Sequence, residues 1–162
     1  MKTLILMRHA KSSWDSPLTD VERPLNARGQ TGATALGKWL RSQALQPDSI
    51  LCSYAVRTME TVERLALGVP YHPIRSLYLA PSELMYDHLL NASGETLLMV
   101  AHNPGTADLA HDLTNAPSGH DRFEDHPTGS TSVLTFDIAR WADLKMGTGT
   151  LAHFVIPADL DS

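Results

Sequence analysis

The sequence predicts an α/β fold, a three-layer sandwich with a mainly parallel central sheet. Two observations support this fold class: short apolar runs of strand length, and helix-length segments between them in which apolar residues recur every three or four positions. The apolar runs do not alternate with polar residues, as expected of strands that are covered on both faces. Strands that alternate with helices favour parallel pairing, with helices on both sides of the sheet.

The expected elements follow one another without an internal repeat. The expected strands are residues 3–7, 49–52, 96–101, 132–136 and 151–156. The expected helices are residues 27 to about 44, 55–67, 82–90 and 104–113, the first with Asn26 as its N-cap. Two irregular stretches remain. They are residues 17–28, which contain two prolines, and residues 114–129, a polar, turn-rich segment expected to form one long surface loop.

Length and composition favour a single domain over residues 1–162, because one domain typically has ~100–200 residues. The net charge of −5 argues against a general nucleic-acid binder, which usually carries a basic surplus. No apolar stretch approaches the ~20 residues of a membrane-spanning helix, and the first apolar run is too short for a signal peptide. The single cysteine, Cys52, is consistent with a reducing compartment. We therefore expect a cytoplasmic protein with neither a membrane nor a nucleic acid as partner.

Polar residues directly follow three of the expected strands. They are Arg8 and His9 after the first strand, Ser53 and Arg57 after the second, and His102 and Asn103 after the strand at 96–101. Ligands of open parallel sheets bind outside the carboxyl ends of the strands, so we expect these side chains to meet in one crevice. The sequence therefore places two arginines and two histidines in one electropositive pocket.

This combination of residue types suits phosphoryl transfer. Arginine presents a planar fork that matches phosphate oxygens. Histidine serves as a nucleophile in covalent catalysis, and nearby cations stabilise the charge on the transferred group. The pocket is therefore predicted to bind a phosphate and to transfer it through a histidine.

Three motifs in this order resemble those of the histidine phosphatase superfamily. They are Arg8-His9-Ala10, Ser53-x3-Arg57-x3-Thr61 and Ala101-His102-Asn103-Pro104. The segment from Leu6 to Trp14, with Glu22-Arg23-Pro24-Leu25-Asn26-x2-Gly29, is similar to the small phosphohistidine-phosphatase branch. Ala10 and Ala101 stand where many members have glycine, and little disruption is expected while both backbones keep a negative φ.

The resemblance implies a phosphoglycerate-mutase-like fold and a metal-independent phosphatase without a cofactor. It implies that His9 is the phosphorylated nucleophile and that His102 completes the anion pocket. Arg8 and Arg57 would clamp the phosphoryl oxygens. Glu83 lies where many members carry the proton donor, although a solvated carboxylate at a helix start is an equal interpretation. The remaining substrate-binding candidates are Lys11, Ser53 and Asn103.

The preferred substrate is phosphohistidine in a partner protein. Only 45 positions separate Arg57 from His102, so no large insertion caps the pocket there, and an open site suits a phosphate carried on another protein. An imidazole leaving group also demands less acid catalysis than an alkoxide, which fits an uncertain proton donor. The alternative is a phosphatase of a sugar phosphate or similar small phosphometabolite, while a mutase would need a more enclosed site.

Two further classes remain open. A non-catalytic phosphate-binding module is disfavoured by His9, because binding alone does not need a nucleophile. A metal-dependent hydrolase would use a His-rich segment, but the segment lacks close ligand spacing such as His-Glu-x-x-His, so a solvated loop is favoured. The residues of that segment are His111, Asp112, His120, Asp121, Glu124, Asp125 and His126.

Overall fold

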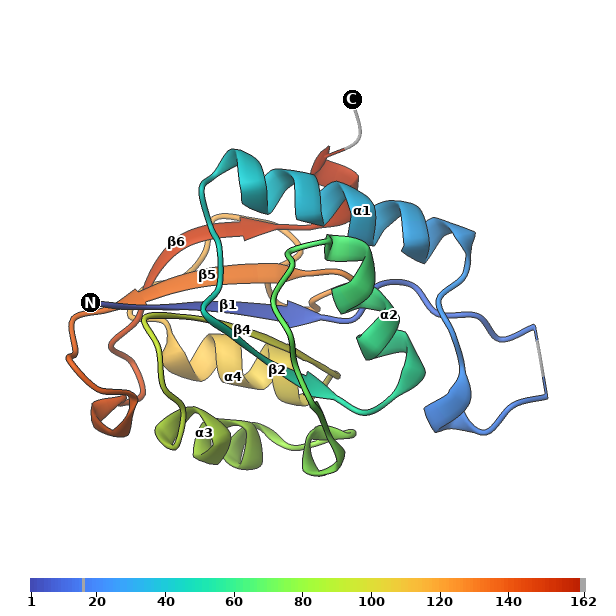
Figure 1. The fold of residues 1–162 in the computed structure, drawn as a ribbon. Helices are drawn as coiled ribbons and strands as arrows, with labels where there is room; N and C mark the ends of the chain where they lie inside the picture. The colour runs from blue at the N-terminus through green and yellow to red at the C-terminus, as the bar shows by residue number, and fades with distance from the viewer. Residues whose placement is uncertain (16, 161–162) are drawn as a thin grey trace.

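A six-stranded sheet forms the centre of the protein, in a computed structural model that describes residues 1–15 and 17–160 (Figure 1). The strands are β1 (Lys2–Arg8), β2 (Ser49–Ser53), β3 (Pro73–Ile74), β4 (Thr96–Ala101), β5 (Thr131–Phe136) and β6 (Thr150–Val155). Their order across the sheet is β3-β2-β4-β1-β5-β6. Strands β1 to β4 pair in parallel, whereas β5 runs antiparallel to both β1 and β6. The predicted mainly parallel sheet is confirmed.

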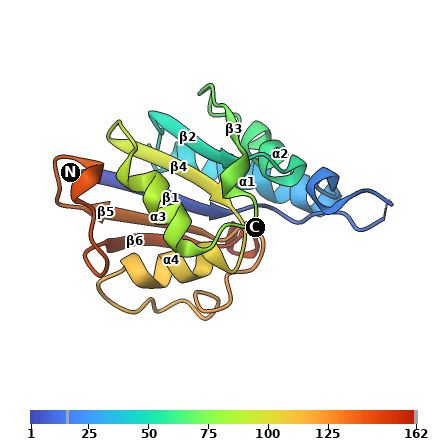
Figure 2. The same cartoon turned by 90° about the horizontal axis from the view of Figure 1, so that it is seen from below.

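Helices cover the sheet on both faces (Figures 1 and 2). The helices are α1 (Ala27–Ser42), α2 (Val56–Leu65), α3 (Ser82–Leu90) and α4 (Gly105–Leu113). Short 3-10 helices are η1 (Asp20–Glu22), η2 (Arg75–Leu77), η3 (Trp141–Asp143) and η4 (Pro157–Leu160). One core lies between the sheet and the pair α1 and α2, and a second lies between the sheet and the pair α3 and α4. The three-layer α/β sandwich is therefore confirmed.

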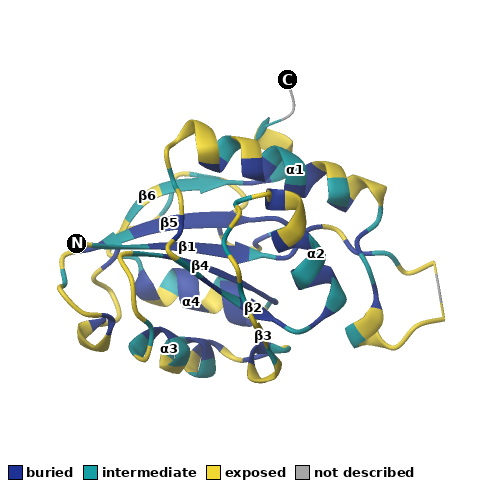
Figure 3. Cartoon of the chain, viewed as in Figure 1, coloured by how far each residue is buried: buried dark blue, intermediate teal, exposed yellow. Residues whose placement is uncertain are grey.

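The two cores explain why the strand sequences are apolar without alternation. In β1, Leu4 and Leu6 belong to the core beneath α3 and α4, whereas Ile5 and Met7 belong to the core beneath α1 and α2. All four side chains are fully buried (Figure 3). Burial of one such side chain stabilises the fold by roughly 1.5–3 kcal/mol, so each face of the strand needs apolar residues.

The start of α1 holds the segment that follows β1. Asn26 caps the helix as predicted, because its side chain accepts a hydrogen bond from the Gly29 amide at 2.8 Å. A Cβ atom at Gly29 would lie 2.0 Å from the carbonyl oxygen of Lys11. Only glycine at this position lets the chain after His9 pass so close to the helix.

The segment at 114–129 differs from the predicted surface loop. Phe123 and His126 are buried, at 3% and 0% exposure. Their rings pack against Phe154 of β6 with centroid distances of 5.1 and 5.0 Å, and the ring of Phe123 also contacts His111 of α4 at 4.7 Å. The expectation was wrong at these positions because isolated aromatic rings in a polar segment carry no periodicity that indicates burial. Over the described residues, no helix has the length and apolar character needed to cross a membrane.

Candidate active site

A cavity of about 190 Å³ lies at the carboxyl ends of β1 and β4 and beside the start of α2. Its wall includes six of the predicted site residues, Arg8, His9, Lys11, Arg57, His102 and Asn103. Residues from three separated parts of the sequence therefore meet, as the strand-end argument expects.

The ring of His9 is held in one orientation. Its Nδ1 lies 2.7 Å from the carbonyl oxygen of Ala10. Because a carbonyl oxygen only accepts, Nδ1 carries the proton and Nε2 carries the lone pair. The backbone is fixed as well, since the His9 amide donates to Ala101 and the His9 carbonyl accepts from Gly129. The hydroxyl of Thr61 accepts from the Ala10 amide at 3.1 Å, which ties α2 to the same turn.

Both active-site histidines are neutral at physiological pH. Burial lowers the pKa of His9 to about 3, against the opposing effect of the hydrogen bond to Ala10, and the charges of His102, Arg57 and Arg8 lower it further. Burial and the charge of Arg57 likewise lower the pKa of His102 to about 3. The Nε2 atom of His9 is therefore an unprotonated nitrogen surrounded by cations.

These shifts predict that neither ring titrates in the physiological range. Because folding lowers both pKa values from ~6.5, the unfolded chain takes up protons first as the pH falls. The stabilising effect of the neutral rings is complete above ~6.5 and is lost as the pH falls towards the folded value of about 3. The expected result is that NMR resonances of the His9 and His102 rings stay constant from about pH 5 to 8, whereas in denaturant they titrate near 6.5. Titration of either folded ring near 6.5 would contradict the assignment.

The guanidinium of Arg57 is fixed by a residue that sequence reasoning missed. Its Nη1 donates to the carbonyl of Asp20 at 2.7 Å and its Nη2 to the Asp20 carboxylate at 2.9 Å. Burial acts to raise the pKa of Asp20, but hydrogen bonds from Tyr78 and Arg57 and the charge of Arg57 lower it to about 2. Asp20 is therefore an ionised carboxylate that orients Arg57.

His102 lies between Arg57 and Ser53. The Nη2 of Arg57 lies 3.4 Å from Nδ1 of His102, and a guanidinium only donates, so this nitrogen accepts. The proton is then on Nε2, which donates to the Ser53 hydroxyl at 2.8 Å. Ser53 is fully buried behind His102, so the structure brings this predicted substrate ligand to the histidine and not to the cavity wall.

Backbone atoms of the segment at 114–129 position Arg8 and Asn103. The carbonyl of His126 accepts from Nη1 of Arg8 and from Nδ2 of Asn103, both at 2.9 Å. The Nε atoms of Arg8 and Arg57 are buried and have no hydrogen-bond partner among the described residues. Donors of this kind are matched by the oxygens of a phosphoryl group.

The exposed rim of the cavity is built around Arg23, which sequence reasoning placed only within a motif. Its Nη1 donates to the Ser12 hydroxyl at 2.7 Å and to the Ser13 carbonyl at 3.1 Å. Its Cζ lies 3.5 Å from the ring centre of Trp14. Arg23 therefore holds Trp14 at the cavity mouth.

Comparison with known proteins agrees with this geometry. The family model of the histidine phosphatase superfamily (branch 1) matches residues 4–78. The uncharacterized protein Rv1276c of Mycobacterium tuberculosis is 34% identical over 160 residues, which cover 93% of this chain and 99% of the relative. This chain belongs to the histidine phosphatase superfamily.

Solved structures place this histidine phosphatase beside the small SixA-like branch. The structure of SixA from Nakamurella multipartitia has a TM-score of 0.86 and 29% identity, over 96% of both chains. The protein histidine phosphatase SixA in complex with tungstate shares the fold, with a TM-score of 0.80 and 22% identity over 98% of this chain and 99% of that one. The predicted phosphoglycerate-mutase-like fold and phosphatase activity are confirmed.

Glu83 of this phosphatase stands apart from the other predicted site residues. It is exposed in the first turn of α3, and it is not part of the cavity wall. The structure thus brings the cations and histidines together and leaves this carboxylate outside them.

The His-rich segment forms polar and aromatic contacts with its surroundings. Among the residues that the structure describes, no group of three or more His, Cys, Asp or Glu side chains could hold a metal ion. His120 Nε2 lies 2.8 Å from the carboxylate of Asp159, and His111 Nε2 lies 3.6 Å from that of Glu124. These contacts attach the segment to α4 and to η4.

Proposed function

We propose that this protein is a metal-independent phosphatase that works through phospho-His9 and acts on phosphohistidine in a partner protein. The observation that carries the proposal is the Nε2 of His9, which has no partner among the described residues and belongs to a cavity lined by Arg8 and Arg57. A fixed, neutral imidazole beside two cations suits nucleophilic attack on phosphorus.

The reaction has two steps. In the first, the Nε2 lone pair of His9 forms a bond to phosphorus as the bond to the leaving nitrogen breaks, and the leaving imidazole keeps or takes up a proton from solvent. In the second, water attacks phosphorus, inorganic phosphate leaves, and a proton passes to solvent as His9 is restored. Arg8 and Arg57 stabilise the charge on the phosphoryl oxygens in both steps.

The acid–base character of the cavity supports a leaving group that needs little protonation. The described part of its wall contains no aspartate or glutamate. The neighbouring Asp20 has a pKa lowered to about 2 by its hydrogen bonds and by Arg57, against the effect of burial, so it is ionised and is a poor acid at neutral pH. An imidazole leaving group can depart without a proton donor in the cavity more readily than an alkoxide can.

The mouth of the cavity supports a macromolecular substrate. Trp14 and Leu79 lie on its wall and are exposed, at 73% and 53%. Large apolar side chains exposed beside a reactive centre are typical of protein contact surfaces. A phosphohistidine that protrudes from another protein could reach His9 while its surroundings contact this rim.

The role of Glu83 and the substrate class are tested by one panel of leaving groups. Glu83 is outside the cavity wall but only four positions after Leu79, which belongs to it, and we propose that Glu83 reaches the leaving group only when substrate is bound and then protonates alkoxides only. Glu83→Gln is then expected to lower kcat/KM for a sugar phosphate by ~10²–10⁴-fold, and to leave phosphohistidine peptide and aryl phosphate nearly unchanged. The wild type should prefer the phosphohistidine peptide over sugar phosphates.

Steady-state kinetics of the two proteins on the three substrates provide the measurement. Asp87→Asn, an exposed change on the same helix, serves as the matched control. An equal loss across all three leaving groups would assign Glu83 to the fold or the pocket shape. A large wild-type preference for one sugar phosphate would transfer the function to a small phosphometabolite.

Activity is expected to persist in the presence of a chelator. The wall supplies positive charge through Arg8, Arg57 and Lys11. This charge can neutralise the phosphoryl oxygens, as a divalent ion does in metal-dependent phosphoryl transfer. Turnover of aryl phosphate with and without EDTA, after dialysis, measures this directly. Loss with chelator and recovery with one divalent ion would establish a metal-dependent hydrolase instead.

A small phosphometabolite is the second candidate substrate, and one observation favours it. A larger cavity of about 410 Å³ adjoins the His9 cavity and shares Arg8, Lys11 and Thr128 with it. Cavities of roughly 300–1,000 Å³ are the size that small ligands occupy.

A further inference from the structure

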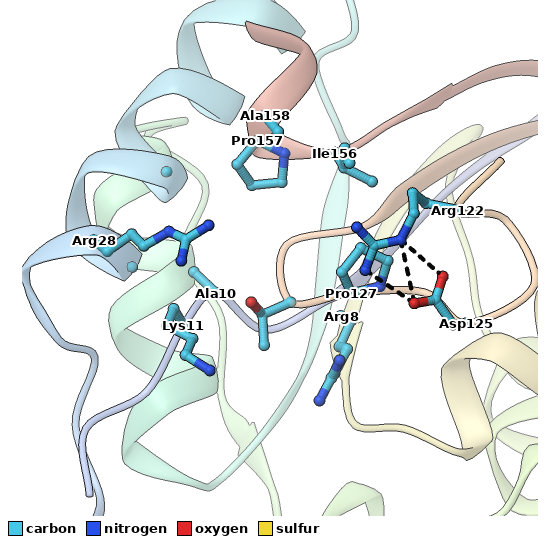
Figure 4. A pocket seen from close by; sticks show the side chains of 13 residues that line it. Arg8, Ala10, Lys11, Arg28, Arg122, Asp125, Pro127, Ile156, Pro157 and Ala158 are labelled. Atoms are coloured by element: carbon cyan, nitrogen blue, oxygen red, sulfur yellow. Dashed lines mark hydrogen bonds and ion pairs between the residues drawn. The ribbon is translucent and has the colours of Figure 1, made fainter. Parts of the chain in front are cut away.

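The adjoining cavity is built from four separate parts of the chain, including the segment from Arg8 to Lys11 at the end of β1 (Figure 4). Arg28 comes from the first turn of α1, Arg122 from the segment at 114–129, and Pro157 from η4. Lys11 lies on the wall of both cavities. A molecule bound at His9 can therefore extend into this second space without leaving the protein surface.

Positive charge on the second cavity exceeds negative charge. Arg122 is paired with Asp125 at 2.9 Å, and Asp125 is the single acid on the described wall. Lys11 and Arg28 form no ion pair within the described residues. The chain as a whole has a net charge of −5, so this local excess of cations is not a result of composition. Uncompensated cations in a concave site attract anions.

Glycines keep this space open and bring its walls together. Gly29 and Gly32 line it from α1, and neither carries a side chain into it. A Cβ atom at Gly32 would lie 3.3 Å from Cβ of Pro157, a close contact between α1 and η4. Ile156 and Pro157 add apolar groups on the side away from Arg8 and Lys11 (Figure 4). The cavity thus combines an apolar side with three cations, Arg8, Lys11 and Arg28, that form no ion pair within the described residues.

We propose that this cavity is a second anion subsite, which binds a phosphoryl or carboxylate group carried by the leaving-group part of the substrate. The proposal rests on the phosphatase activity proposed for His9, because the first phosphoryl group lies there. The shared chemistry is a second anion on the substrate. It comes either from an acidic side chain beside the phosphohistidine or from the second phosphate of a small bisphosphate.

Arg28 is the residue to change, because it lines the second cavity and is absent from the wall of the first. The variants are Arg28→Gln and Arg28→Glu. Lys38→Gln removes one charge from the exposed side of the same helix, away from both cavities, and is the matched control. Arg8 and Lys11 are left intact because they also face His9.

Two pairs of substrates reveal the subsite. The first pair is a phosphohistidine peptide with glutamate or with glutamine beside the phosphohistidine. The second is fructose 1,6-bisphosphate and fructose 6-phosphate. Aryl phosphate, which carries no second anion, reports on the chemistry at His9.

We expect the wild type to prefer the doubly anionic member of at least one pair by about tenfold in kcat/KM, the effect of one charge-assisted contact. Arg28→Gln should reduce the preference and Arg28→Glu should reverse it, while Lys38→Gln should keep it. Turnover of aryl phosphate should be equal in all four proteins. A preference within the peptide pair identifies a protein substrate, and one within the sugar pair identifies a small molecule.

The proposal is overturned if the wild type shows no preference in either pair. It is also overturned if Arg28→Glu changes the turnover of aryl phosphate as much as it changes the turnover of the doubly anionic substrates. Failure of the underlying function gives a different result. If phosphohistidine peptides are not hydrolysed but the bisphosphate preference depends on Arg28, the partner-protein substrate is wrong and the subsite stands. If phosphohistidine is hydrolysed with no effect of Arg28, the subsite alone is wrong.

Discussion

His9→Ala is expected to abolish turnover of every phosphate substrate, with a loss of at least about 10⁴-fold in kcat. The reason is geometric. On the cavity wall, His9 is the histidine whose Nδ1 is occupied by a carbonyl and whose Nε2 has no partner among the described residues, whereas both ring nitrogens of His102 are engaged by Arg57 and Ser53. Without His9, attack would have to come from water alone, and the covalent route is lost.

The adduct itself is the decisive measurement. Rapid quench with labelled substrate should trap a phosphoryl group that is labile in acid and stable in base, and peptide mapping should place it on His9. Thermal unfolding checks that His9→Ala folds, and His72→Ala, an exposed histidine outside the cavity, is the control. Label on another residue, or full turnover in His9→Ala, would remove His9 from the nucleophile role.

Arg57→Ala is expected to lower kcat/KM by at least about 100-fold, or about 2.7 kcal/mol at 1.36 kcal/mol per decade. The guanidinium is 3% exposed, lies 3.4 Å from the ring of His102 and is aligned by two hydrogen bonds from its Nη atoms to Asp20. A cation fixed in this way stabilises the charge that develops on the phosphoryl oxygens without further reorganisation.

Lysine at this position should restore little activity. One ammonium cannot contact the Asp20 carbonyl, the Asp20 carboxylate and a phosphoryl oxygen as a planar fork does. Arg64→Ala, an exposed arginine on α2, is the matched control and should retain wild-type kinetics. Because Arg57 is buried, unfolding curves must accompany the kinetics. Near-wild-type kcat/KM in a folded Arg57→Ala would exclude it from the site.

Most of the fold was predictable because the central strands β1, β4 and β5 are buried on both faces and each long helix is buried on one. The strand at Thr96–Ala101 and the helix at Ser82–Leu90 have the predicted bounds. The direction of β5 was not predictable in this way, since a strand buried on both sides has the same apolar composition in either orientation. Strand β3 has two residues, Pro73 and Ile74, too few for a pattern.

The sequence predicted the site residues that stand at strand ends. It did not predict the side chain and the backbone carbonyl that hold the arginines in place. Arg8 is the last residue of β1, and His9 and His102 directly follow β1 and β4, so topology alone brings them together. Asp20 belongs to an irregular stretch in which no periodicity indicates a partner. The carbonyl of His126 is a backbone atom, and no residue type encodes its position.

The contact between Arg8 and this carbonyl has a consequence for the substitutions that the segment at 114–129 can accept. Any amino acid supplies a carbonyl, but position 126 is constrained both by its main-chain path, with φ of 46°, and by its buried ring, which packs against Phe154. The φ value favours glycine, asparagine, aspartate or histidine there. Substitutions at the exposed positions of this segment should therefore leave Arg8 in place, whereas a change in the main-chain path at position 126 should displace it.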